Sequence, residues 1–203
     1  GLIAELGWVV LREACRTAAQ WTVAAGPDRF VLRVNVAADQ LRSQDFAERV
    51  VATLFEAGFP PSALCLELTE STLLADPHGS AELFAQLRHS GIGLAIDDFG
   101  TGYSSMLQLK QLPLTALKID RSFVHRAHAD ETMRAIFGAS QSLARQLGME
   151  VVAEGVEDRE DWDFLRHSCC HSAQGYFIAR PMPAADLPGW CAGWEQRRKE
   201  LLE

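Results

Sequence analysis

The sequence contains no apolar run close to the roughly 20 residues that a membrane-spanning helix needs. Its most apolar opening stretch, Leu2–Leu11, is interrupted by Glu5 and Gly7. The start of the chain also lacks the basic region, apolar core and small-residue cleavage site of a secretory signal. We therefore expect a cytoplasmic domain without a membrane span, whose parent chain can still be anchored elsewhere.

Cysteine is scarce, and the count of five is odd. Because no CxxC pair is present, neither a disulfide framework nor a zinc ribbon is expected. Positive charge is also in deficit, with 19 Lys and Arg against 27 Asp and Glu. This acidic balance argues against binding to duplex nucleic acid. With 203 residues, of which 48% are hydrophobic, residues 1–203 are expected to form a single domain.

Short apolar runs alternate with longer helical patterns along the chain, which is typical of a parallel sheet built from βα units. Leu2–Ala25 has the apolar spacing of a helix. Six units are predicted after it, with strands at Phe30–Asn35, Leu64–Leu68, Leu94–Asp97, Ala116–Ile119, Glu150–Ala153 and Gly175–Ile178. The predicted helices are Asp45–Ala57, Ser80–His89, Tyr103–Leu109, Glu131–Leu147, Arg159–His167 and Gly189–Leu202.

Two α/β architectures have this alternation, an open doubly wound sheet and a closed barrel. A doubly wound nucleotide-binding fold needs a glycine-rich turn after its first strand, and Asn35–Ala38 contains no glycine. We therefore predict a TIM-like (β/α)₈ barrel, of which this chain supplies about six units. The chain begins with Gly1 and a helix that no strand precedes, so we expect the first strands to lie upstream.

Polar residues stand at the carboxyl ends of the predicted strands, where barrel enzymes carry their catalytic groups. They are Asn35, Glu67, Glu70, Asp97, Asp98, Lys118, Asp120, Glu154 and Glu157, while Gln174 opens the sixth strand. Carboxylates that gather at one rim repel each other unless protons or cations compensate. Oxygen ligands without Cys or His favour Mg²⁺ or Mn²⁺ over Zn²⁺. Because the backbone can turn at the end of a strand, we expect Asp97 and Asp98 to face one site, with one carboxylate bridging two metals.

Several of these residues also have structural explanations. An acidic residue at the end of a strand often caps a helix. For Glu70, Asp120 and Glu157, such a structural role explains the residue about as well as a role in the site does. Asn35, flanked by two valines, can be a buried amide. The six histidines are scattered over predicted helices and loops, so we do not expect them to bind metal.

Six stretches of the chain resemble the EAL domain family, which hydrolyses the bacterial messenger cyclic di-GMP. They are Asn35-Val36, Leu66–Ser71, Asp97–Ser105, Leu117–Asp120, Ala153–Glu157, and Ala173–Tyr176 followed by Arg180-Pro181. The resemblance runs in family order across essentially the whole chain. It implies a (β/α)₈ barrel that opens cyclic di-GMP to linear pGpG. It also implies an attached regulatory or sensor domain upstream, and it leaves a homodimer open.

The resemblance further implies two Mg²⁺ or Mn²⁺ ions at the site. By this resemblance Asn35, Glu67 and Asp97 hold the first ion. Asp97 bridges to the second ion, which Asp98 also holds. Glu154 is implied to be the catalytic glutamate beside this second ion.

Other positions take supporting roles in the same comparison. Lys118 resembles the lysine that positions the attacking water, and Gln174 resembles a substrate-contacting amide. Glu70 corresponds to the glutamate that steadies the glycine loop after the third strand. Asp120 and Glu157 are assigned to the support of neighbouring loops.

The Glu-Ala-Leu motif that names the family and the substrate-binding arginine near it are absent from the sequence. The similar triplets Ala4-Glu5-Leu6 and Ala81-Glu82-Leu83 lie in predicted helices and not at a strand end. One hypothesis is a phosphodiesterase whose parent chain supplies the missing glutamate, so that residues 1–203 alone are nearly inactive. The alternative is a catalytically inactive cyclic di-GMP receptor or protein-interaction scaffold. A third, an enolase-like Mg²⁺ barrel, does not share the six motifs. The charged Asp98, Lys118 and Glu154 favour the first hypothesis, since buried charges without a function only cost stability.

Overall fold

The computed structural model describes residues 1–25, 30–75, 77–100, 106–168 and 170–202. Its centre is a parallel six-stranded sheet, with β1 Leu32–Asn35, β2 Leu64–Thr69, β3 Gly93–Phe99, β4 Ala116–Ile119, β5 Glu150–Ala153 and β6 Ser172–Ala173. Each strand pairs with the next one in sequence. This order belongs to a barrel, since a doubly wound sheet reverses its strand order at a switch point. The predicted TIM-like class is confirmed.

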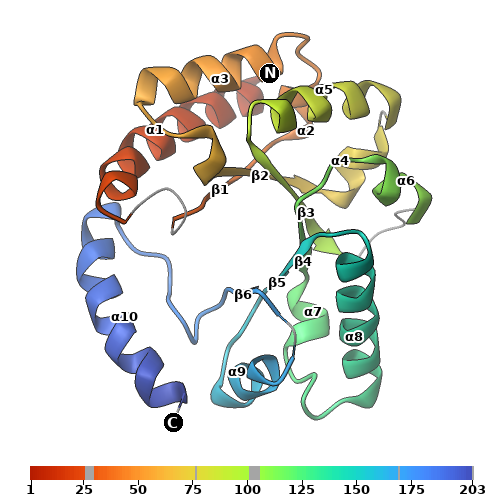
Figure 1. The fold of residues 1–203 in the computed structure, drawn as a ribbon, viewed down its shortest axis with the longest axis vertical. Helices are drawn as coiled ribbons and strands as arrows, with labels where there is room; N and C mark the ends of the chain where they lie inside the picture. The colour runs from red at the N-terminus through yellow and green to blue at the C-terminus, as the bar shows by residue number, and fades with distance from the viewer. Residues whose placement is uncertain (26–29, 76, 101–105, 169, 203) are drawn as a thin grey trace.

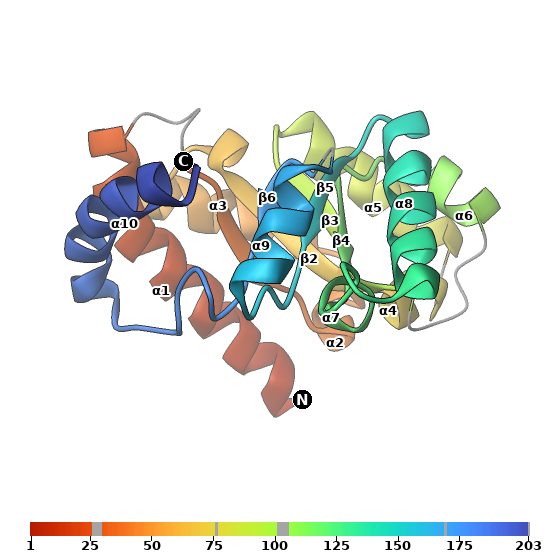
Figure 2. The ribbon, with the colours of Figure 1, turned by 90° about the horizontal axis from the view of Figure 1, so that it is seen from below.

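Helices surround the curled sheet (Figure 1). They are α1 Leu2–Ala25, α2 Ala38–Leu41, α3 Phe46–Ala57, α4 Glu70–Ala75, α5 Pro77–His89, α6 Met106–Gln111, α7 Arg121–Val124, α8 Glu131–Gln146, α9 Arg159–Arg166 and α10 Leu187–Leu202, with 3₁₀ turns at Pro61–Ala63 and Ala184–Asp186. Figure 2 shows α1 and α10 at one end of the molecule and α6 and α8 at the other. None of the described helices combines the length and hydropathy needed to cross a bilayer.

Side chains alternate between the two faces of each strand, so the sheet carries one buried cluster on each face. On β2, Leu64, Leu66 and Leu68 belong to the main core between the sheet and the helices. Cys65 and Glu67 therefore point to the opposite face, which is the inside of the curl. Cys65 belongs to a second buried cluster on that face, together with Ala95 and Ala116. Two residues further along these three strands stand Glu67, Asp97 and Lys118.

The sixth predicted strand, Gly175–Ile178, is wrong. Residues 175–178 form a turn instead, in which the N–H groups of Ile178 and Ala179 each donate to the Gly175 carbonyl at 3.0 Å. Gly175 packs so tightly that a Cβ there would lie 2.2 Å from the Val156 carbonyl oxygen. The actual strand β6 has only two residues, too few to show a hydrophobic pattern.

The other predicted strands are confirmed with small changes at their ends. The short helices α2, α4 and α7 were not predicted. The predicted helix Tyr103–Leu109 begins outside the described residues, and its described part lies in α6. Among the described residues, β1 and β6 each pair on one side only, so the six predicted units form an open half-barrel.

Candidate active site

Lys118 is the centre of the cluster at the carboxyl ends of the strands. It lies on β4, and its side chain is only 3% exposed. Its Nζ lies 2.6 Å from Glu67 Oε2, 2.8 Å from Asp97 Oδ1 and 2.8 Å from Glu154 Oε1. These carboxylates come from β2, β3 and the residue that follows β5. The three protons of the ammonium group therefore match three acceptors.

Three carboxylates around one ammonium group set the electrostatics of this cluster. Burial alone lowers the pKa of Lys118, but the hydrogen bonds that it donates to Asp97, Glu154 and Glu67 outweigh burial and raise the pKa above its usual value. Burial raises the pKa of Glu154, and the bond to Lys118 opposes that rise. Because Lys118 and Arg33, which lies 3.8 Å from Glu67, do not balance the carboxylates of Glu67, Asp97, Asp98 and Glu154, the cluster keeps an excess of negative charge that attracts cations.

A bulge at the end of β3 determines where Asp97 and Asp98 point. The pairing with β4 shifts between Ile96 and Phe99, so Phe99 instead of Asp98 lies opposite Ile119. Asp98 has a positive φ of 53°, and its N–H donates to Asp97 Oδ1 at 3.1 Å. The extra residue breaks the alternation of the strand, so consecutive side chains can face one site.

Asp97, Asp98 and Glu154 each offer a carboxylate oxygen, and these atoms all lie within 4.8 Å of one another. Partial burial, then the charges of Asp97 and Asp120, raise the pKa of Asp98. Carboxylates this close together repel one another, and a bound proton or cation relieves that repulsion. The structure thus brings together the two aspartates and the glutamate that the sequence singled out.

Glu67 and Asn35 lie side by side on neighbouring strands. Asn35 pairs with Glu67 in the register of β1 and β2, and its side chain is exposed, which excludes the buried-amide explanation. Glu67 Oε1 is buried, and among the described residues no donor makes a hydrogen bond to it. Arg33 Nη1 lies 3.8 Å from that oxygen. This oxygen is thus free to accept a cation.

Glu70 and Gln174 each follow the carboxyl end of a strand, Glu70 that of β2 and Gln174 that of β6. Glu70 is 4% exposed and begins α4 directly after β2. The glycine loop that it is predicted to steady lies outside the described residues beyond Gly100. Gln174 follows β6 with an exposed side chain, and its N–H donates to the Ala153 carbonyl at 2.8 Å. Their assigned roles remain predictions.

Asp120 and Glu157 lie beside the carboxylate cluster and make structural contacts. Asp120 is the N-cap of α7 and accepts from the Ser122 N–H at 2.9 Å. Glu157 forms an ion pair with Arg121 at 2.8 Å. The supporting roles that the sequence suggested for both residues remain predictions.

The sequence did not predict a network of hydrogen bonds around Asp161. The Asp161 side chain is fully buried and accepts from the N–H groups of Arg126 and Glu157 at 2.9 and 3.2 Å. His125 Nδ1 lies 2.8 Å from its Oδ2. His125, Asp158 and Asp161 are close enough together to suit a metal, but Asp158 also bonds the Asp161 N–H as the N-cap of α9. The group therefore serves as a hydrogen-bonded link between α7 and α9.

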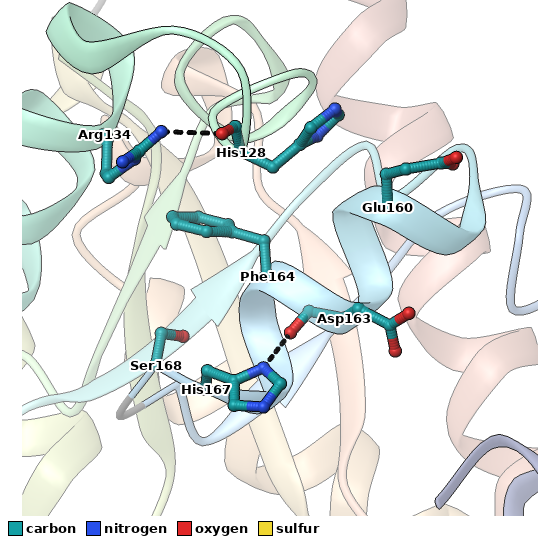
Figure 3. Close-up of a pocket in the computed structure, with 7 residues that line it drawn as sticks. All are labelled: His128, Arg134, Glu160, Asp163, Phe164, His167 and Ser168. Atoms are coloured by element: carbon teal, nitrogen blue, oxygen red, sulfur yellow. Dashed lines mark hydrogen bonds between the residues drawn. The ribbon is translucent and has the colours of Figure 1, made fainter.

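A hollow on the outside of the barrel lies between α8 and α9 (Figure 3). Arg134 Nη2 donates to the His128 carbonyl at 2.6 Å, and His167 Nδ1 lies 2.6 Å from the Asp163 carbonyl oxygen. Its lining contains none of the predicted site residues. Because none of the residues predicted to act in catalysis or metal binding lines this hollow, the inner cluster is the better candidate for chemistry.

Comparison with known proteins identifies the family of this chain. The EAL domain family model matches residues 1–181, and the chain belongs to that family. It is 42% identical over 187 residues to the bifunctional diguanylate cyclase/cyclic di-GMP phosphodiesterase MucR of Pseudomonas aeruginosa, covering 92% of this chain and 27% of MucR. It is 41% identical to the cyclic di-GMP phosphodiesterase NbdA of the same organism, covering 92% and 24%. The chain thus spans about a quarter of these relatives.

Solved structures agree with this assignment. The EAL domain of Mycobacterium smegmatis DcpA has a TM-score of 0.89 at 37% identity, covering 95% of this chain and 86% of that one. A cyclic di-GMP complex of the MucR phosphodiesterase has a TM-score of 0.86 at 42% identity, covering 92% and 75%. A manganese and cyclic di-GMP complex of Klebsiella pneumoniae BlrP1 has a TM-score of 0.79 at 28% identity, covering 88% and 45%.

Proposed function

We propose that this chain is the hydrolytic domain of a cyclic di-GMP phosphodiesterase that forms linear pGpG. The observation that carries the proposal is the buried Lys118 with Glu67, Asp97 and Glu154 around it. Such a group is costly to bury, and it lies at the strand ends where barrel enzymes place their catalytic residues. The inactive receptor or scaffold is not favoured, because relatives such as MucR and NbdA are named as phosphodiesterases.

The chemistry of the cluster fits divalent cations of the Mg²⁺ or Mn²⁺ type. The buried Glu67 Oε1 has no hydrogen-bond donor among the described residues, and the neighbouring carboxylates supply further oxygen ligands. Asn35, Glu67 and Asp97 would hold one ion, while Asp97, Asp98 and Glu154 would hold a second. When bound, such ions supply Lewis-acid activation of water and neutralise phosphate charge.

The side chains of this chain would orient the substrate and accept the proton of the attacking water. Lys118 holds Glu67, Asp97 and Glu154 in place, and its positive charge would help to position the attacking water. The Glu154 carboxylate, whose pKa is raised by burial, is a suitable proton acceptor. Gln174 lies on the same rim, where its exposed amide can bond the substrate.

The supporting roles belong to acidic residues beside the cluster. Glu70 would steady the glycine loop, Asp120 holds the start of α7, and Glu157 ties the loop after Glu154 to Arg121. We propose these assignments together with a regulatory or sensor domain elsewhere in the parent protein. A homodimer of the parent and a location in the cytoplasm remain parts of the same proposal.

The test is a chromatographic assay of cyclic di-GMP turnover by the full-length protein. We expect pGpG to form in Mg²⁺ or Mn²⁺ and formation to stop when EDTA removes the ion. Tight binding of cyclic di-GMP without any hydrolysis in either metal would instead support the receptor function.

A further inference from the structure

Arg33 is a long cationic side chain on the inner face of the curled sheet. It pairs with Cys65 in the register of β1 and β2, so both side chains face the interior. The neighbouring interior residues, Ala95 and Ala116, are small and buried with Cys65. This leaves room for the guanidinium group, whose Nη1 donates to Cys65 Sγ at 3.5 Å. The Arg33 side chain is 21% exposed.

The two carboxylate oxygens of Glu67 have different surroundings. Oε2 lies 2.6 Å from the ammonium group of Lys118. Oε1 faces Arg33 Nη1 at 3.8 Å, within ion-pair range but too far for a hydrogen bond. Since a guanidinium group stays protonated in proteins, the oxygen that is free for a cation always lies beside a fixed positive charge.

We propose that Arg33 is a positioning residue that orients Glu67 and limits the affinity of the site for divalent cations. The inference rests on the proposed function, in which Glu67 binds a metal ion. Lys118 fixes one oxygen of Glu67, and the charge of Arg33 draws the other toward β1. That same charge repels a cation on Oε1, so its loss should tighten cation binding on the order of tenfold.

The experiment measures Mn²⁺ binding by isothermal titration calorimetry on the chelator-treated full-length protein at low ionic strength. Arg33→Met removes the charge and keeps an unbranched side chain, whereas Arg33→Lys keeps the charge. Arg88→Met is the matched control, because Arg88 lines the same hollow at the amino-terminal ends of the strands but donates to the Ile92 carbonyl at 2.9 Å. We expect a tighter Mn²⁺ Kd for Arg33→Met alone.

Each other outcome has a definite meaning. If the wild type binds Mn²⁺ and Arg33→Met binds it equally or more weakly, the inference on Arg33 is wrong while the proposed function stands. The inference is also wrong if Arg33→Lys or Arg88→Met tightens binding as much as Arg33→Met does. If none of the forms binds Mn²⁺, the proposed function fails, and the inference fails with it.

Discussion

Replacement of Lys118 by methionine tests the electrostatic account of the cluster. Removing one partner of a buried ion pair costs about 3–5 kcal/mol, and Lys118 contacts three carboxylates at 2.6–2.8 Å. We therefore expect a loss near 5 kcal/mol for Lys118→Met at pH 8 without metal. This is a large share of the roughly 5–15 kcal/mol that stabilises a typical domain.

The stability of this variant should also depend on pH. Without the ammonium group, Lys118 no longer opposes the rise that burial causes in the pKa of Glu154, so the folded-state pKa of this carboxyl group lies above its unfolded value. Protonation then stabilises the folded form, so the stability of the variant should recover as the pH falls from 8 towards 5. In the wild type, the pKa of Lys118 is raised in the folded state. The contribution of Lys118 to the free energy of unfolding is therefore lost only as the pH rises above its pKa in the unfolded chain, which is near 10.4.

Urea unfolding at several pH values, in the presence of a chelator, measures both effects. Lys110→Met serves as the control because Lys110 is exposed on α6, and its loss should change stability by no more than about 0.5 kcal/mol. A Lys118→Met variant within about 1 kcal/mol of the wild type at pH 8, with no recovery at lower pH, would refute the reasoning.

Three further predictions concern metal binding, the glycine loop and the sheet edges. Asp98→Asn should abolish hydrolysis with little loss of fold, and unchanged turnover would exclude the two-metal hypothesis. Glu70→Ala should reduce activity about 10–100-fold in a metal-dependent way, whereas Glu67→Ala should be inactive, and equal loss in both variants at saturating metal would contradict the separate roles. A polypeptide of residues 1–203 exposes the edges of β1 and β6 and should self-associate, so a monomer by light scattering with a cooperative melt would contradict that expectation.

The sequence predicted the parts of the fold that depend on local pattern. Short apolar runs such as Leu64–Leu68 and Ala116–Ile119, each interrupted by a single charged residue, identified buried strands, since parallel strands covered on both faces are mostly apolar. Strand β6 was not predicted because its two residues, Ser172 and Ala173, form no apolar run. The apolar Gly175–Ile178 was mistaken for a strand because periodicity does not reveal the tight packing of Gly175 against Val156.

The candidate site was predicted less completely than the strands that carry it. The ends of the predicted strands identified Lys118, Glu67, Asp97 and Glu154 one at a time. The contacts of Lys118 with the three carboxylates depend on the register between the strands, which no local sequence pattern encodes. The bulge at Asp98 gave no signal beyond the two adjacent aspartates. Arg33 was missed, although a charged residue between Leu32 and Val34 was a sign that one side chain faces inward.

The most direct test of the central claim compares the wild type with Glu154→Gln in cyclic di-GMP hydrolysis. We expect at least a 100-fold loss of kcat for Glu154→Gln, because the amide cannot accept the proton. The variant should still bind the substrate. Glu160→Gln, an exposed change on α9, should leave kcat unchanged. Full turnover by Glu154→Gln in Mg²⁺ or Mn²⁺ would contradict the assignment of catalysis to this cluster.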